Sequence, residues 1–136
     1  MLGIYCVDDE LVSLTALDIQ MRMGLDESKY VVELIDDSTQ VLEVIKTHEA
    51  SAIRPFLMIT DYYMPLLNGD ALTRQVKAAF PAIQVIVLSG NSNIQAINGL
   101  VEDDLMCAFI GKPWKRSDLT TALNRVLPPA DHITDL

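Results

Sequence analysis

Acidic, hydroxyl and amine side chains stand directly after short apolar segments of this sequence. Asp8 and Asp9 follow the first such segment, Asp61 follows the third, and Ser89 and Lys112 follow the fourth and fifth. Crowded carboxylates repel one another unless a cation lies between them, and carboxylate oxygens suit Mg2+. An aspartate can also attack a phosphoryl group, giving an acyl phosphate. The five residues therefore point to phosphoryl transfer onto Asp61, with Asp8 and Asp9 on the metal and Lys112 and Ser89 on the phosphoryl oxygens.

Each of these residues alone has an ordinary structural explanation. An acid pair after a strand is usually a helix N-cap with its neighbouring charge. Ser89 could cap the helix that follows it, Lys112 could be a solvated loop lysine, and Pro65 and Gly69 could be turn residues. Only the set as a whole favours the chemical interpretation, and that interpretation requires the fold to bring the residues together.

Short apolar segments alternate along the chain with longer segments of helical periodicity. Several of the short segments are almost continuously apolar, which is typical of strands covered by helices on both faces. Strands are predicted at residues 3–7, 30–35, 56–60, 83–88 and 106–110.

Apolar residues recur at three- and four-residue spacing after each predicted strand, which indicates five helices. Asp37 and Ser38 are predicted to cap the second helix, and Ser117 and Asp118 the fifth, which ends at the proline pair 128–129. The helical stripes are Leu11, Leu14, Leu17 and Met21; Val41, Leu42 and Ile45; Leu72, Val76 and Phe80; Ile94, Ile97 and Val101; and Leu119, Leu123, Val126 and Leu127.

The strict alternation of strand and helix, repeated five times, predicts an α/β fold. Connections of this length favour a doubly wound, five-stranded parallel sheet with right-handed crossovers and helices on both faces. Ligands of such sheets bind at the carboxyl ends of the strands. The residues that could do chemistry follow the strands, so they are expected at that edge.

Composition narrows the class of protein. The 136 residues fit one domain, and the net charge of −9 disfavours direct binding to nucleic acid or to an anionic membrane.

No motif for a dinucleotide or other organic cofactor is present, and a cytoplasmic location is expected. Cys6 and Cys107 are predicted to be small hydrophobes within strands, and His48 and His132 to be surface residues.

The motifs at the strand ends resemble those of the response-regulator receiver domain, the CheY-like family of two-component signalling. The resemblance rests on VDDE (Asp8, Asp9), TDYYMP (Asp61) with Gly69 after it, LSGN (Ser89) and FIGKPW (Lys112), and it covers about residues 3–127. It implies a flavodoxin-like fold with strand order 2-1-3-4-5. Residues 1–127 would form the receiver domain, and residues 128–136 a short tail or the start of a linker.

The resemblance also implies a role for each motif residue. Asp61 would accept a phosphoryl group from a histidine kinase or phosphotransfer protein. Asp9 would bind Mg2+ directly, Asp8 mainly through water, and Asp61 and the backbone carbonyl of Tyr63 would complete the protein ligands. Ser89 and Lys112 would bind the phosphoryl group.

Three further residues carry roles implied by the same resemblance. Phe109 lies at the position of an aromatic switch residue that turns inward when Ser89 moves toward the phosphoryl group; an ordinary core aromatic is the alternative. Tyr63 and Asn91 lie where side chains tune hydrolysis, and a bulky Tyr63 would shield the acyl phosphate from water.

A switch of this kind is not expected to be an enzyme beyond its own phosphorylation and dephosphorylation. Its partner would be an effector protein, an output domain or a second protomer, bound through the fourth helix, fifth strand and fifth helix. Two alternatives stay open. One is a Mg2+-dependent phosphatase with an aspartate nucleophile, for which Asp8-Asp9-Glu10 offers only a D-x-E variant of the usual pattern. The other is an interaction module that works without phosphorylation.

Overall fold

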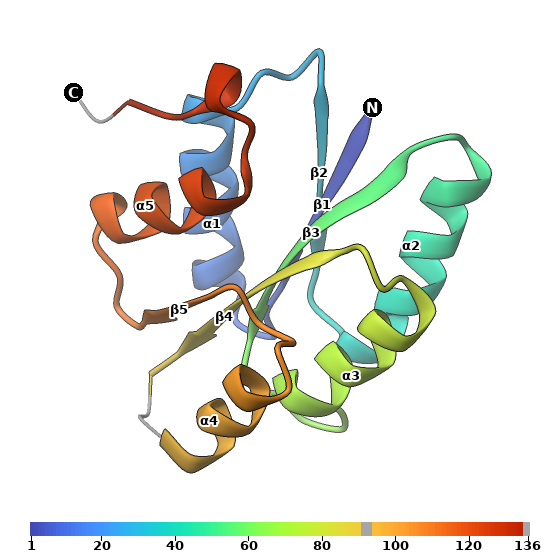
Figure 1. Ribbon diagram of the computed structural model, residues 1–136, viewed down its shortest axis with the longest axis vertical. Helices are drawn as coiled ribbons and strands as arrows, with labels where there is room; N and C mark the ends of the chain where they lie inside the picture. The colour runs from blue at the N-terminus through green and yellow to red at the C-terminus, as the bar shows by residue number, and fades with distance from the viewer. Residues whose placement is uncertain (91–93, 135–136) are drawn as a thin grey trace.

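The computed structural model describes residues 1–90 and 94–134, and in this part of the chain helices cover both faces of one parallel sheet (Figure 1). The strand order is β2-β1-β3-β4-β5, which confirms the predicted fold class. The strands are β1 Leu2–Val7, β2 Tyr30–Ile35, β3 Arg54–Asp61, β4 Gln84–Ser89 and β5 Ala108–Gly111. The α-helices are α1 Leu11–Gly24, α2 Val41–Ala50, α3 Gly69–Ala79, α4 Ile94–Glu102 and α5 Arg116–Val126, with short 3-10 helices at Ser38–Gln40 and Pro129–Asp131.

Two hydrophobic layers enclose the sheet, because successive residues of a strand point to opposite faces. In β1, Ile4 and Cys6 pack with α1 and α5, whereas Tyr5 and Val7 pack with α2 and α3. Both faces of the central strands are therefore buried, as their almost continuous apolar sequences predict. Among the described residues, no helix combines the length and apolar character needed to cross a membrane.

The strand positions agree closely with the prediction, but one of the two helix caps does not. The carboxylate of Asp37 accepts the Thr39 N–H at 2.9 Å and starts the 3-10 turn before α2, as expected. The predicted cap at Ser117 and Asp118 is wrong, because α5 already begins at Arg116 and its N-cap is Lys115. Asp118 instead accepts the backbone N–H of Lys115 at 3.0 Å from within the first turn.

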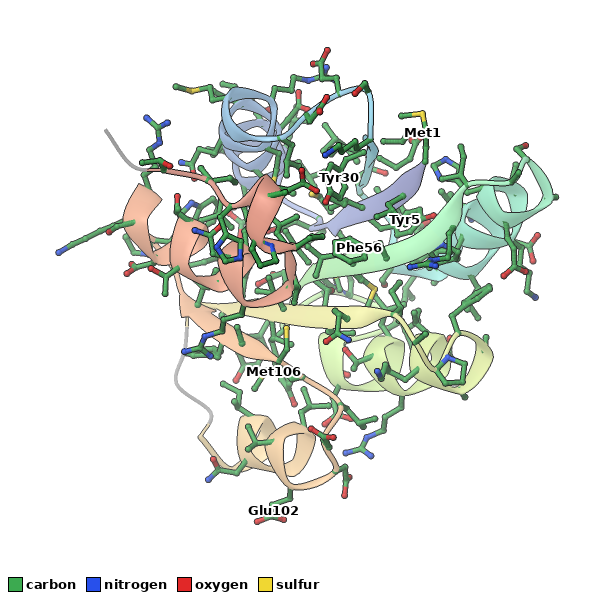
Figure 2. All side chains as sticks on the ribbon, turned by 45° about the horizontal axis from the view of Figure 1, so that its top comes forward. Met1, Tyr5, Tyr30, Phe56, Glu102 and Met106 are labelled. Carbon is green, nitrogen blue, oxygen red and sulfur yellow. The ribbon has the colours of Figure 1, made fainter. Side chains whose placement is uncertain are left out.

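His48 differs from the expected surface residue, although His132 is exposed as predicted. Its ring lies between two side chains, with Nδ1 3.1 Å from the hydroxyl of Tyr5 and Nε2 3.1 Å from Oε1 of Glu33. Tyr5 is fully buried in the middle of β1 (Figure 2), so this contact joins the helix α2 to strands β1 and β2.

The cysteines follow the prediction in part. Cys6 is buried within β1, as expected. Cys107 is only partly buried and directly precedes β5, and its thiol donates to the carbonyl of Val85.

Gly69 sits at the start of α3, where the helix meets the end of β3. Its N–H donates to the carbonyl of Tyr62 at 2.8 Å. A Cβ at this position would lie 2.6 Å from the backbone oxygen of Asp61 and 2.8 Å from Cα of Tyr62. Only glycine allows this close approach, so Gly69 serves to hold the end of β3 where the acidic residues gather.

We expect Gly69→Ala to destabilise the fold by about 1–3 kcal/mol, because the added methyl forces the end of β3 away from α3. Urea unfolding followed by circular dichroism measures the change. Gly111→Ala is the matched control, because a Cβ there meets no atom within 4 Å. Equal stability of the two variants would contradict the packing role of Gly69.

Candidate functional site

The strand register brings the predicted residues to one edge of the sheet. Val7 pairs with Thr60, so Asp8, which follows Val7, lies beside Asp61 on the neighbouring strand. Asp61 in turn pairs with Leu88, and Ser89 pairs with Gly111, directly before Lys112. The carboxyl ends of four parallel strands thus meet, as the order of the motifs predicted.

Three carboxylates form the centre of this edge. Oxygen atoms of Asp8, Asp9 and Asp61 all lie within 4.8 Å of one another. Asp8 is fully buried and Asp61 is only 4% exposed, whereas Asp9 is open to solvent. Water therefore screens little of the repulsion between Asp8 and Asp61.

Lys112 supplies a positive charge to this cluster. Its Nζ donates to Oδ2 of Asp8 at 2.5 Å and lies 3.3 Å from Oδ1 of Asp61 and 3.8 Å from Oε1 of Glu10. The Lys112 backbone N–H donates to the carbonyl of Ser89, so the side chain must cross from the β4–β5 side of the sheet to β1. The length of a lysine side chain makes this crossing possible.

The protonation of the two central groups follows from burial and from each other's charge. Burial acts to lower the pKa of Lys112, but the hydrogen bond to Asp8 and the charge of Asp61 outweigh it, and the pKa is raised. Burial raises the pKa of Asp61 to about 6; Lys112 opposes this change, and the charge of Asp8 adds to it. At neutral pH, Lys112 is a cation and most of Asp61 is a carboxylate, the form that can act as a nucleophile.

The donor set fits a hard divalent cation. Its atoms are all carboxylate oxygens, from Asp8, Asp9 and Asp61, and their combined charge exceeds that of the single Lys112 ammonium. Mg2+ is commonly held by a few carboxylates together with waters and phosphoryl oxygens. Asp8 is already oriented, because its Oδ1 accepts the Glu10 N–H at 2.9 Å while its Oδ2 holds Lys112.

The remaining predicted residues lie around this centre. Ser89 is buried at the end of β4. Tyr63 is 43% exposed, and its ring meets that of Tyr62 edge-on at 4.9 Å between centroids. Phe109 is 41% exposed between the buried Ala108 and Ile110, so it is not the core aromatic considered as an alternative. Asn91 lies outside the described residues.

One contact beside the site was not anticipated. The indole N–H of Trp114 donates to Oε1 of Gln20 at 3.0 Å, which ties the segment after Lys112 to α1. A hollow of about 460 Å3 lies here, with Glu10, Lys112 and Trp114 in its lining. Gln20 gave no signal in the sequence, because its partner is 94 residues away and only the fold brings the two together.

Comparison with known proteins agrees with this geometry. A family model described as the response regulator receiver domain matches residues 4–124. "Two-component response regulator ORR3" of Oryza sativa is 30% identical over 126 residues, which cover 91% of this chain and 89% of that protein. ARR21 of Arabidopsis thaliana is 37% identical over 122 residues, which cover 88% of this chain but only 18% of that protein.

A solved structure has the same fold. The response regulator receiver domain protein of Clostridium thermocellum superposes with a TM-score of 0.76 and 25% sequence identity, over 93% of this chain and 94% of that chain. The chain thus matches one kind of domain over nearly its full length, although it spans only about a fifth of the Arabidopsis relatives it matches.

The raised pKa of Asp61 predicts that this residue destabilises the metal-free fold above about pH 6. A carboxyl with a higher pKa in the folded protein favours folding while it is protonated, and that contribution is lost as the pH rises through the folded pKa. Asp61→Asn should therefore be more stable than the wild type at about pH 7.5 without metal, by about 1–2 kcal/mol. The difference should shrink as the pH falls from about 6 toward 4.

Thermal unfolding in the presence of a chelator, measured across this pH range, tests the expectation. Asp104→Asn removes the same charge from an exposed position away from the site and controls for net charge. A gain in stability that is equal for both variants, or that does not depend on pH, would contradict the role assigned to the burial of Asp61.

Proposed function

The chain belongs to the response regulator receiver domain family, and from this premise we propose that it is a signalling switch that accepts a phosphoryl group on Asp61. The observation that carries the proposal is the position of Asp61. Its carboxylate lies at the end of β3, beside two further carboxylates and 3.3 Å from the ammonium of Lys112. A nucleophile, a metal-binding oxygen set and a cation for the phosphoryl group are thus assembled at one point.

The proposed reaction transfers one phosphoryl group. A carboxylate oxygen of Asp61 attacks the phosphorus, the bond between phosphorus and the donor breaks, and the leaving group takes the electron pair. The product is an acyl phosphate on Asp61. Negative charge is spread over the phosphoryl oxygens in the transition state, so catalysis depends on placing positive charge and hydrogen-bond donors around them.

Lys112 and Ser89 supply these groups from the chain itself. The Lys112 ammonium already lies next to Asp61, and a small shift from Asp8 would bring it to an incoming phosphoryl oxygen. Ser89, at the end of the neighbouring strand β4, would bind another phosphoryl oxygen through its hydroxyl. These roles agree with those implied by the resemblance.

Asp9, Asp61, the backbone carbonyl of Tyr63 and, through water, Asp8 would hold Mg2+. When bound, the ion supplies the positive charge that allows a phosphoryl group to approach three carboxylates. The difference in burial supports this division between Asp8 and Asp9. Asp8 is buried and already bound to Lys112, whereas Asp9 is open to solvent and able to bind an ion directly.

The proposed donor is a histidine kinase or phosphotransfer protein, and the proposed location is the cytoplasm. The signal would pass through Ser89 and Phe109 to the face formed by α4, β5 and α5, where an effector protein, an output domain or a second protomer would bind. An outward Phe109 supports a resting form in which this switch has not turned inward. We propose no catalytic turnover of external substrates.

Acetyl phosphate with Mg2+ provides the direct test. We expect stoichiometric phosphorylation of the chain, detected by intact mass, and none in Asp61→Asn or in the presence of a chelator. Asp70→Asn, which changes an aspartate in the first turn of α3, is the matched control and should label normally. Labelling of Asp61→Asn would contradict the proposal, and sustained turnover of p-nitrophenyl phosphate would favour the phosphatase alternative instead.

Tyr63 generates a second prediction, about the lifetime of the phosphorylated form. Its half-exposed ring, two residues after the acceptor in sequence, would restrict the approach of water to the acyl phosphate, so Tyr63→Ala should hydrolyse several-fold faster than the wild type. Loss of label after removal of acetyl phosphate measures the rate. Tyr63→Phe keeps the ring and should retain the wild-type lifetime. An unchanged lifetime in Tyr63→Ala would disprove shielding by this residue.

A further inference from the structure

The chain does not leave the domain at the end of α5. Residues 128–134, which we name the C-terminal clasp, turn through the 3-10 helix Pro129–Asp131 and fold back beside the end of α1 (Figure 1). This segment lies beyond the residues that the family model matches. The sequence predicts a short tail or the start of a linker here, and residues of this segment also contact the domain through their side chains and backbone.

The first set of contacts joins the clasp to the last turns of α5. The side-chain amide of Asn124 pairs with the backbone of Ile133 in both directions: Nδ2 donates to the carbonyl at 2.9 Å, and Oδ1 accepts the N–H at 2.8 Å. Nε2 of His132 lies 3.0 Å from the carbonyl of Leu127. The side chain of Asn124 thus satisfies both backbone hydrogen-bonding groups of Ile133, as a neighbouring strand would.

The second set joins the clasp to the start of β2. The carboxylate of Asp131, 11% exposed, accepts from Nζ of Lys29 at 2.8 Å and from the hydroxyl of Tyr30 at 2.7 Å. The hydrogen bond from Lys29, and to a lesser extent that from Tyr30, lowers the pKa of Asp131, so this residue stays a carboxylate at neutral pH. Tyr30, labelled in Figure 2, is itself buried against Phe56.

An apolar contact completes the attachment. Ile133 packs on the hydrophobic cluster between the sheet, α1 and α5. It reaches this place because α1 ends in Gly24, where a Cβ would lie 2.8 Å from Cδ1 of Ile133. The seven residues of the clasp therefore join α5 to α1 and β2, two elements near the other end of the sequence.

We propose that the C-terminal clasp is a restraint on α5 that favours the resting form of the switch. Since α5 belongs to the proposed signalling face, the inference rests on the proposed function. Movement of the last turns of α5 relative to α1 and β2 would break the Asn124–Ile133 pairing or pull Asp131 away from Lys29 and Tyr30. The free energy of these contacts is then part of the cost of switching, and a weaker clasp lowers that cost.

Asn124→Ala tests the restraint, because the two hydrogen bonds of this side chain both go to the clasp. Beryllofluoride with Mg2+ serves as the probe for the phosphorylated form, and the fluorescence of Trp114, the single tryptophan of the chain, follows its binding. We expect the variant to bind beryllofluoride three- to tenfold more tightly than the wild type. Asp131→Asn, which removes the charge paired with Lys29, should act in the same direction.

Arg22→Gln is the matched control. It removes ion pairs with Asp18 and Glu27, near the same end of α1, that do not involve α5 or the clasp, and its affinity for beryllofluoride should equal that of the wild type. If Asn124→Ala and Asp131→Asn bind the probe no more tightly than this control, the restraint is disproved. Failure of the wild type to bind beryllofluoride or to be labelled by acetyl phosphate would instead overturn the proposed function, and the inference with it.

Hydrogen exchange provides an independent readout, because coupling between two sites is reciprocal. The amide of Ile133 donates to Asn124 in the resting form and should exchange slowly. Binding of beryllofluoride and Mg2+ to the wild type should accelerate exchange at this amide, although it lies at the opposite end of the sheet from Asp61. Protection that is unchanged on binding would contradict the coupling even if the affinities differed as expected.

Discussion

The candidate site is defined by the repulsion between buried carboxylates at the end of the sheet and by the ammonium of Lys112, which lies among them. Asp8 and Asp61 are removed from water, so their charges interact more strongly than they would at the surface. Lys112 binds both, but it cannot neutralise both. The remaining negative charge favours a divalent cation at this site. In the proposed reaction, the same charge would repel a phosphoryl group until a cation is bound.

The gathering of these charged residues can be predicted from the sequence, because the order of the strands in a parallel sheet determines which residues lie at its carboxyl edge. Each strand ends at the same edge, so residues that follow β1, β3, β4 and β5 must meet there. Asp8, Asp61, Ser89 and Lys112 could therefore be predicted to meet at one edge from the order of the predicted strands. The contact of Asp8 with Lys112 and the exposure of Asp9 could not be predicted from the sequence, because neighbouring residues of the same type differ only in the direction of their side chains.

The features that sequence reasoning missed are contacts between distant residues. His48 was predicted at the surface, because nothing near it in sequence indicates that Tyr5 and Glu33 flank its ring. The cap of α5 was misplaced for a local reason, since Ser117 and Asp118 resemble an N-cap and Lys115 does not. The contacts of the C-terminal clasp could not be predicted from the sequence, because their partners lie up to 102 residues away.

The helix α5 connects the two ends of the molecule that carry these interactions. It begins at Arg116, four residues after Lys112, and its last turn is held by the clasp at the edge where β2 begins. In the proposed reaction, a shift of Lys112 toward a phosphoryl group would act on the first turn of a helix whose last turn is anchored. Such a helix would tilt about its anchored end or break the clasp contacts, and the strength of those contacts would decide between the two responses. The segment beyond the family-matched residues would then set how far the signal at Asp61 travels along α5.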